Sequence, residues 1–268
     1  MYASEHGSGL PLMLLHGFFA DHRLLSVIDG DVFDGRPGWR RIYADLPGMG
    51  QSPAGPHIDS TDAVAREVAE FVDDTLGDRP YAVLGQSYGG GIARYLAAHH
   101  RDRVRGLALL CPMIGPHPDV RQVPPRTVLR RDPALIAGLS PEDAADYTEV
   151  AVLESAETWE LFRDSILPGA RAADEVALGR IRQRYGLSTY PESTVPPYAG
   201  PTEIICGRQD HVAGYRDAVD ALEHYPRANV SIIDGAGHNA HIEQRQTVAA
   251  LIGGWLDRVR ETWDVHAP

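Results

Sequence analysis

The stretch YAVLGQSYGGG, Tyr81 to Gly91, decides the fold more than any other part of the chain. An apolar run typical of a buried strand ends at Ser87, which has Gly85 two residues before it and Gly89 two residues after it. A strand that turns sharply into a helix strains its corner residue, and side chains two positions to either side would collide. The pattern therefore predicts a tight strand-to-helix turn from which the Ser87 hydroxyl projects.

Similar apolar runs recur along the chain and alternate with helical patterns. The strand candidates show little polar alternation, which is typical of strands covered on both faces; they are 10–17, 40–48, 81–87, 104–112, 202–210 and 230–238. Helical spacing of apolar residues is found at 61–77, 91–100, 215–225 and 247–259. The first of these helices has Thr61 as its candidate N-cap and ends at Gly77. This alternation predicts an α/β fold, with a mostly parallel, twisted sheet and helices on both faces.

One long region interrupts the alternation. Between about Met113 and Pro201 there is no clear strand pattern, but three segments have helical character: 141–155, 158–167 and 172–185. The region is too long for a loop inside a compact domain. We therefore predict a helical cap at 113–200, inserted into a core made of 1–112 and 201–268. The cap would cover a pocket; the alternative is a group of helices packed beside the sheet without contact to a ligand.

The composition limits the partners that the chain can bind. At 268 residues it is long enough for one large α/β domain, or for one domain with an insertion. With 25 Lys and Arg against 37 Asp and Glu, the formal charge is −12, which opposes binding to nucleic acid and to anionic membranes. We therefore expect a small-molecule substrate, no nucleic-acid partner and no membrane partner. The oligomeric state stays open, with a homodimer as one alternative.

The cysteines and the first residues point to a cytoplasmic protein. Cys111 and Cys206 are the only cysteines and form no CxxC motif, so neither a disulfide framework nor a cysteine zinc site is indicated. A single bridge between them stays open. The N-terminal residues lack the basic start, apolar core and small-residue cleavage site of a signal peptide. No run approaches the roughly 18 apolar residues of a membrane span, so we expect a soluble protein.

Ser87 needs partners before it can act as a nucleophile. A serine hydroxyl reacts poorly at neutral pH without a base, normally a histidine that an acid holds in the right tautomer. Of the 12 histidines, His238 is the candidate base because its glycine-bearing loop follows the last strand pattern; His241 is expected on the surface of the next helix or behind the site. Asp210 is the candidate acid because it follows a strand at the end where open α/β sheets gather their ligands. Asp234 is the alternative acid.

The same chemistry needs backbone donors for a developing oxyanion. The Tyr88 N–H, directly after the nucleophile, is one candidate, and the Phe18 N–H in the loop HGFFAD is the other. We expect His16 to fix this loop rather than to act chemically. Phe19 and Gln86 are candidate substrate-binding residues. No metal or organic cofactor is required for this chemistry.

Five segments in register resemble the α/β-hydrolase fold superfamily: HGFFAD (16–21), DLPGMGQS (45–52), GQSYGG (85–90), GRQD (207–210) and GAGHNAHIEQ (235–244). The resemblance covers nearly the whole chain. It implies that DLPGMGQS is a structural loop near the rim of the site, so Asp45 is not the acid, and that 113–200 is a helical cap. Two features depart from the superfamily pattern: Gln86 stands where histidine is frequent, and the leading hairpin is shortened or absent.

We therefore expect a serine hydrolase in which Ser87, His238 and Asp210 cleave an ester or lactone through an acyl-enzyme. The alternatives are a carbon–carbon bond hydrolase, a perhydrolase or an acyltransferase with the same triad, and a catalytically silent receptor on this scaffold. Four arginines of the cap region are candidates to attract a carboxylate, but solvated cap charges explain them equally: Arg126, Arg130, Arg131 and Arg163.

Overall fold

The computed structural model describes residues 1–115 and 120–264 of the chain. Seven strands form one sheet in the order β1-β3-β2-β4-β5-β6-β7. Only β1 runs antiparallel to its neighbour, and every other pair is parallel. The predicted α/β fold is confirmed. The strands are β1 (Ala3–His6), β2 (Leu10–Leu15), β3 (Trp39–Ala44), β4 (Tyr81–Gln86), β5 (Val104–Leu110), β6 (Thr202–Gly207) and β7 (Ala228–Ile233).

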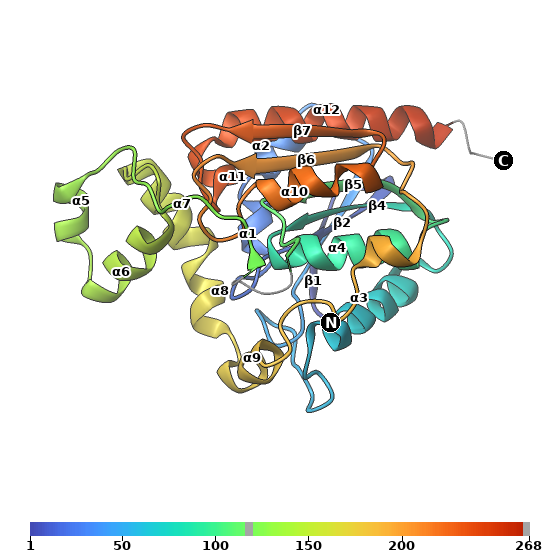
Figure 1. The fold of residues 1–268 in the computed structure, drawn as a ribbon, viewed down its shortest axis with the longest axis horizontal. Coiled ribbons are helices and arrows are strands. Elements are labelled where there is room, and N and C mark those ends of the chain that lie inside the picture. Colours follow the sequence, from blue (N-terminus) through green and yellow to red (C-terminus); the bar gives the residue numbers. More distant parts are fainter. Residues whose placement is uncertain (116–119, 265–268) are drawn as a thin grey trace.

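Helices cover both faces of this sheet (Figure 1). Those of the core are α1 (Arg23–Ser26), α2 (Asp29–Phe33), α3 (Thr61–Leu76), α4 (Tyr88–His99), α10 (Arg216–Asp220), α11 (Ala240–Glu243) and α12 (Arg245–Asp264), with a 3-10 helix η3 (Ala221–His224). Between β5 and β6 lie α5 (Pro133–Gly138), α6 (Pro141–Val150), α7 (Ala156–Ser165), α8 (Leu167–Ala172), α9 (Glu175–Arg182) and a 3-10 helix η2 (Pro191–Thr194). Residues 116–119 of the predicted cap and 265–268 of the predicted core lie outside the described residues.

The strands build two hydrophobic cores, one on each face. In β2, Met13 and Leu15 join the core under α3 and α4, whereas Leu12 and Leu14 join the core under α12. Successive side chains of a strand point to opposite faces, so a strand covered on both sides needs apolar residues at every position. This explains why the strand patterns in the sequence lack polar alternation.

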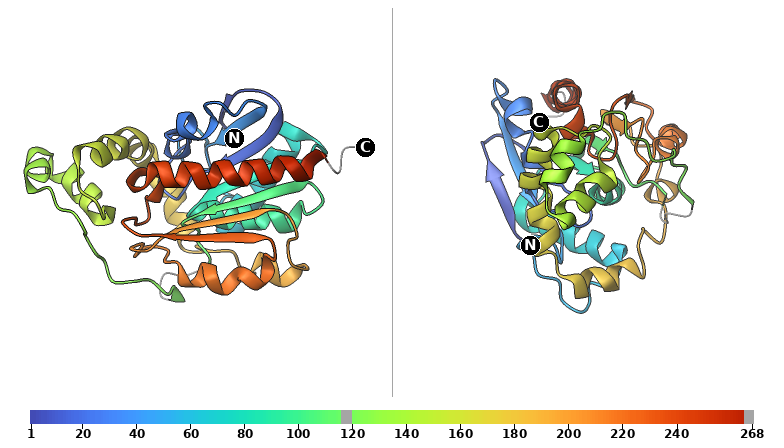
Figure 2. Two further views of the ribbon diagram at one scale, coloured as in Figure 1. Left: turned by 90° about the horizontal axis from the view of Figure 1, so that it is seen from above. Right: turned by 90° about the vertical axis from the view of Figure 1, so that its left-hand side faces the viewer.

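The inserted helices divide into two parts. Helices α5, α6 and α7 lie together at one end of the molecule (Figures 1 and 2) and share a small core in which Tyr147, Trp159 and Phe162 pack ring against ring. Helix α9 belongs instead to the main core, because its Leu178 and Ile181 pack with the side chains under α3 and α4. The insertion therefore extends the sheet domain with α9 and carries a separate lobe with α5 to α7.

A buried ion pair lies near the end of the insertion, where the chain re-enters the core. Arg94 of α4 forms two hydrogen bonds with Glu192 of η2, at 2.5 and 2.7 Å, and the Tyr225 hydroxyl also donates to this carboxylate. All three side chains are buried. Because the carboxylate lies beside the Arg94 cation, its pKa is held below the ordinary value against the opposing effect of burial. The pair fastens the end of the insertion to the helix that follows Ser87.

Two details differ from the sequence predictions, and a third, the shortened leading hairpin, agrees with them. The N-cap of α3 is Ser60 rather than Thr61, since the Ser60 hydroxyl accepts the Ala63 N–H at 3.3 Å. Helix α4 begins at Tyr88, three residues earlier than its apolar pattern, which a run of glycines hides. The leading hairpin is reduced to the four-residue strand β1, which pairs with β3.

The structure also tests two further expectations from the sequence, those on a disulfide bridge and on a membrane-spanning segment. Cys111 and Cys206 are both buried and free, so the bridge that the sequence left open does not form. No helix in the described ranges combines the length and the apolar character that crossing a bilayer requires.

The glycines around Ser87 generate a stability prediction. A Cβ atom at Gly89 would lie 2.2 Å from the Leu15 carbonyl oxygen, whereas one at Gly254 in α12 would meet no heavy atom within 4 Å. We expect Gly89→Ala to lower the free energy of unfolding by at least ~3 kcal/mol, because backbone must move. Gly254→Ala should raise it by up to ~1 kcal/mol, the helix preference of alanine. Urea denaturation measures both, and equal stabilities would contradict this account of the turn.

Candidate active site

Ser87 occupies a strained corner between β4 and α4. Its backbone angles are φ 51° and ψ −114°, outside the regions that side chains prefer. A Cβ atom at Gly85 would lie 2.2 Å from the Gly89 carbonyl oxygen, so glycine is required where these two backbone segments cross. The Ser87 N–H donates to Leu110 of the next strand at 3.0 Å, and its carbonyl accepts from Met113 at 2.9 Å. The predicted tight turn therefore exists and is hydrogen bonded on both sides.

The three residues predicted to act together meet at the carboxyl edge of the sheet. Ser87 follows β4, Asp210 follows β6 and His238 follows β7. The Ser87 Oγ lies 2.8 Å from His238 Nε2, and His238 Nδ1 lies 3.0 Å from Asp210 Oδ2. Both distances are those of hydrogen bonds. The carboxyl ends of parallel strands converge at one edge, which is why three positions far apart in sequence form one chain of contacts.

The surroundings of Asp210 fix its charge and the histidine tautomer. The carboxylate is completely buried, and its Oδ1 accepts the N–H groups of Val212 and Ala213, each at 2.9 Å. Burial opposes ionisation, but attraction to His238 and the hydrogen bonds to the charged form outweigh it and hold the pKa of Asp210 below its ordinary value. An ionised acceptor at Nδ1 keeps the proton on that nitrogen and leaves Nε2 free to accept one from Ser87.

The rival candidates lie elsewhere. Asp234 accepts a hydrogen bond from the Gln209 side chain at 2.8 Å, whereas His238 Nδ1 is paired with Asp210. His241 is in α11, as predicted, and it is completely buried, which excludes the helix surface and leaves the alternative that it lies behind the site. Neither ring nitrogen has a partner among the described residues. Burial, with a smaller effect of the His238 charge, lowers the pKa of His241 to about 3, so its ring is neutral.

The two backbone N–H groups predicted to bind an oxyanion, those of Phe18 and Tyr88, have no protein acceptor among the described residues. Tyr88 is the first residue of α4, where a helical N–H has no partner within the helix. The Phe18 N–H shares a peptide group with the Gly17 carbonyl, which accepts a hydrogen bond from His16 Nδ1 at 2.7 Å. Since the two groups of a trans peptide point in opposite directions, this bond sets the direction of the Phe18 N–H.

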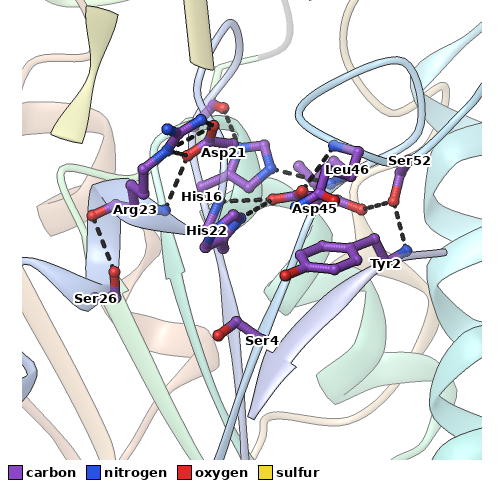
Figure 3. A network of polar contacts seen from close by, with 12 residues as sticks. Tyr2, Ser4, His16, Asp21, His22, Arg23, Ser26, Asp45, Leu46 and Ser52 are labelled. Carbon is purple, nitrogen blue, oxygen red and sulfur yellow. Dashed lines mark hydrogen bonds and ion pairs between the residues drawn. The ribbon is translucent and has the colours of Figure 1, made fainter. Parts of the chain in front are cut away.

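His16 is itself held in one tautomer (Figure 3). Its Nε2 accepts the Leu46 N–H at 2.9 Å, so the ring proton is on Nδ1, where it donates to Gly17. Burial lowers the pKa of His16 and keeps it neutral. The geometry agrees with the expectation that His16 fixes the loop.

The acidic residues beside this loop are occupied by protein partners. Asp45 accepts the backbone and ring N–H groups of His22, at 2.7 and 2.8 Å, and the Gln51 N–H at 2.8 Å (Figure 3). Asp21 forms a two-pronged pair with Arg23. Although Asp21, His22 and Asp45 bring their potential ligand atoms within 4.8 Å of one another, these hydrogen bonds account for the cluster without a metal ion. As expected, Asp45 shapes a loop and is not the acid of the triad.

Gln86 lies below the site. Its side chain is 1% exposed, and its amide Nε2 donates to the backbone carbonyl of His238 at 3.2 Å. Its Oε1 lies against Gly17, where a Cβ atom would approach to 2.3 Å. The expected contact of Gln86 with substrate is therefore corrected: the side chain is directed toward protein and spans from the Phe18 loop to the histidine loop.

An aromatic cluster borders the Phe18 and Tyr88 backbone. Phe18 packs edge-on against Phe19, Tyr88 and Tyr185, with ring centres 4.8, 5.0 and 5.2 Å away. Phe19, the other candidate for substrate binding, is half-buried here and has a positive φ of 63°. Tyr185 follows α9, and the sequence offered no signal for it beyond an aromatic residue at the end of a helical pattern.

Glu243, a second residue without a signal in the sequence, joins the inserted lobe to the histidine loop. One carboxylate oxygen accepts the N–H groups of Val152 and Leu153, at 2.6 and 3.1 Å, and the other accepts the Gly237 N–H at 2.6 Å. Burial raises the pKa of Glu243 despite these three donors. Because Gly237 directly precedes His238, the lobe and the histidine are held by the same side chain.

The four arginines that were candidates for attracting a carboxylate all have partners in the lobe. Arg126 donates to the carbonyls of Thr148 and Glu149, and Arg130 donates to that of Glu154. Arg131 lies 3.9 Å from the Glu154 carboxylate, and Arg163 pairs with its neighbour Asp164. These contacts favour the interpretation that they are structural or solvated charges of the cap.

Comparisons with known proteins agree with this fold. Residues 11–133 match the family model of the alpha/beta hydrolase fold. The chain is 28% identical to 2-succinyl-6-hydroxy-2,4-cyclohexadiene-1-carboxylate synthase of Klebsiella pneumoniae (strain 342), over 91% of this chain and 93% of that protein. It is also 28% identical to 2-hydroxymuconate semialdehyde hydrolase of Pseudomonas sp. (strain CF600), over 94% of this chain and 88% of that protein.

Among solved structures, an alpha/beta superfamily hydrolase from Oenococcus oeni PSU-1 has a TM-score of 0.88 and 26% identity, with 96% of each chain covered.

The contacts of Glu243 generate a prediction. Glu243→Ala leaves three N–H groups without their acceptor, so we expect the free energy of unfolding to fall by about 2–4 kcal/mol. Glu243→Gln keeps one oxygen and should lose less than Glu243→Ala. Urea denaturation of both variants measures this, and an unchanged midpoint in Glu243→Ala would contradict the role of this carboxylate in holding the lobe.

The burial of His241 generates a second prediction, on pH. A group whose folded pKa lies below its unfolded value contributes stability that is present above the unfolded pKa and is lost as pH falls. With an unfolded pKa near 6.5, lowering the pH from 7.5 to 5 should cost the wild type about 2 kcal/mol through His241. His241→Leu should remove that part of the pH dependence. Urea denaturation at both pH values tests it, and equal losses in the two proteins would count against it.

Proposed function

Because the chain belongs to the α/β-hydrolase fold superfamily, we propose that it is a serine hydrolase that cleaves an ester-type bond by transferring the acyl group first to Ser87 and then to water. The observation that carries this proposal is the continuous hydrogen-bonded chain from Ser87 through His238 to Asp210, at 2.8 and 3.0 Å. A binding protein has no need for a nucleophile, a base and an orienting acid in reactive order.

The first half of the proposed reaction forms an acyl-enzyme. The Nε2 atom of His238 takes the hydroxyl proton as the Ser87 Oγ attacks the carbonyl carbon. The ring then carries a positive charge, which the ionised Asp210 stabilises through Nδ1–H. When the tetrahedral intermediate collapses, the bond from the carbonyl carbon to the leaving oxygen breaks, and the leaving alcohol receives the proton from Nε2.

The second half repeats these steps with water. His238 takes a proton from a water molecule, whose oxygen attacks the acyl carbon, and returns the proton to the Ser87 oxygen as the acid leaves. In both halves the negative oxygen of the intermediate lies where the Phe18 and Tyr88 N–H groups can donate to it. Each such donor contributes about 10²–10³-fold in rate in enzymes of this kind. The position of His16 behind the Phe18 peptide supports this assignment.

Carbon–carbon bond hydrolysis is the second candidate. The same triad serves both reactions, and one relative is named for a semialdehyde rather than for an ester.

A serine rather than an aspartate at position 87 argues against an alkyl-enzyme route, because a serine ether would not be hydrolysed by attack of water at a carbonyl. A perhydrolase or an acyltransferase would use the same acyl-enzyme with a different acceptor.

A labelling experiment tests the nucleophile. We expect a fluorophosphonate probe to modify the wild type at Ser87 and to leave Ser87→Ala unmodified, with the site located by mass spectrometry. Hydrolysis of 4-nitrophenyl acetate should fall about 10⁴-fold or more in Ser87→Ala and in His238→Ala. His57→Ala, which removes an exposed histidine, is the matched control and should retain activity.

The outcomes separate the candidates. Labelling that persists in Ser87→Ala would refute the nucleophile assignment. Absence of both labelling and turnover across short and medium acyl chains would favour the silent receptor. Labelling without release of free acid would favour an acyltransferase.

A further inference from the structure

Arg182 lies at the edge of the aromatic cluster and contacts it through its guanidinium. It is the last residue of α9 and is exposed, and its guanidinium carbon lies 4.3 Å from the centre of the Phe19 ring and 6.0 Å from that of Phe18. Among the described residues it makes no hydrogen bond and no ion pair. The arginines two residues before and after it do have such partners: Arg180 donates to the Gly55 carbonyl at 3.2 Å, and Arg184 pairs with Asp59.

Arg121 approaches the same cluster from the segment after β5. Its guanidinium carbon lies 5.7 Å from the centre of the Tyr185 ring, and it donates to the carbonyls of Gly115 and Val212, each at 3.2 Å. Its Nη2 atom is buried and has no hydrogen-bond partner within the described part of the chain. Because this nitrogen is buried and the Arg121 side chain interacts with the Tyr185 hydroxyl, Arg121 contributes positive charge to the cluster rather than an open donor.

Both cations lie near the residues that carry the proposed oxyanion donors. Tyr185 lies between them in the cluster, with its ring centre 5.2 Å from that of Phe18 and 5.4 Å from that of Tyr88. Burial raises the pKa of the Tyr185 hydroxyl, and the charges of Arg121 and Arg182 both oppose that rise, so both are electrostatically close to it. Since Phe18 and Tyr88 carry the proposed oxyanion donors, we expect a substrate held at Ser87 to lie close to these rings.

The local charge contrasts with that of the whole chain. The protein has 37 acidic residues and a formal charge of −12, yet no carboxylate among the described residues pairs with Arg121 or Arg182. A planar guanidinium matches a carboxylate with two parallel hydrogen bonds. Stacking on Phe19 leaves the edge of the Arg182 guanidinium, where its donors lie, available to such a ligand.

We propose that Arg182, together with Arg121, forms an anion subsite that selects substrates whose acyl part carries a carboxylate. The inference rests on the proposed function and adds a substrate class to it. Arg182 binds the carboxylate through its exposed edge, and the positive charge of Arg121 beside Tyr185 adds to the attraction. The rings of Phe18, Phe19 and Tyr185 pack against the apolar chain between the carboxylate and the reacting carbonyl.

A matched pair of esters tests the subsite. 4-Nitrophenyl hydrogen adipate and 4-nitrophenyl methyl adipate differ only in that the distal carboxylate is free in one and methylated in the other. We expect the wild type to prefer the free carboxylate in kcat/KM by at least ~10-fold, and the ratio to fall about 10- to 100-fold in Arg182→Gln, which is the contribution of one charge-assisted pair. Corresponding ester pairs of the diacids from succinate to suberate vary the distance between the carboxylate and the reacting carbonyl.

Two controls separate recognition from a structural role. Arg184→Gln removes a charge two residues away on the same segment and should leave the ratio unchanged. Arg182→Lys keeps the charge but loses the planar fork, so it should restore only part of the preference. Added salt should reduce the wild-type preference, since an exposed charge is screened. A parallel loss of activity on both esters in Arg182→Gln would show that the residue only packs against Phe19, and would overturn the proposal.

A binding measurement keeps this test independent of the proposed reaction. Calorimetric titration of Ser87→Ala with each ester should show tighter binding of the free carboxylate, and the preference should disappear in Ser87→Ala/Arg182→Gln but remain in Ser87→Ala/Arg184→Gln. Equal affinity of Ser87→Ala for the two esters across all acyl lengths would overturn the anion subsite. Preferential binding without any turnover by the wild type would instead contradict the hydrolase function and leave the subsite in place.

Discussion

The site depends above all on the strained backbone at Ser87. A residue with a side chain is held at φ 51° because Gly85 and Gly89 let two backbone segments cross at a distance that no Cβ atom permits. Hydrogen bonds to Leu110 and Met113 hold the corner from both sides. Strain of this kind persists only where the surrounding structure over-determines it. As a consequence, the Ser87 hydroxyl projects from the end of β4 beside the Tyr88 N–H, which has no acceptor within α4.

Three side chains around this corner act on backbone groups. His16 holds the Gly17 carbonyl, Gln86 donates to the His238 carbonyl, and Glu243 accepts the Gly237 N–H. Each fixes a loop that has no regular hydrogen-bonding pattern of its own, and loops carry reactive groups accurately only when they are held in this way. Glu243 also holds the inserted lobe, so the position of the lobe and the position of the histidine are mechanically linked.

Several acidic side chains bind groups of the protein itself, and this affects where charge is left at the site. Asp45 and Glu243 fix loops by accepting backbone N–H groups, and Glu192 neutralises the buried Arg94. Near Phe18 and Tyr185, two arginines approach aromatic rings, and neither of them forms an ion pair with a carboxylate of the described residues. An acidic protein can therefore present a locally positive site, because the field close to a site is set by the nearest groups and not by the net charge.

The sequence by itself determined the strands β2 to β7, the turn at Ser87 and the identity of the residues that meet there, because glycine spacing and apolar periodicity are local consequences of backbone geometry. It gave no pattern for β1, α1 and α2, which are only four or five residues long. Only the tertiary structure decided that Gln86 faces protein, that His241 is buried and that Ser60 caps α3. It alone also brought Glu243 to the lobe and Arg182 to the aromatic cluster. These contacts join residues that are distant in the chain and leave no periodic signal, since they depend on how separate elements pack.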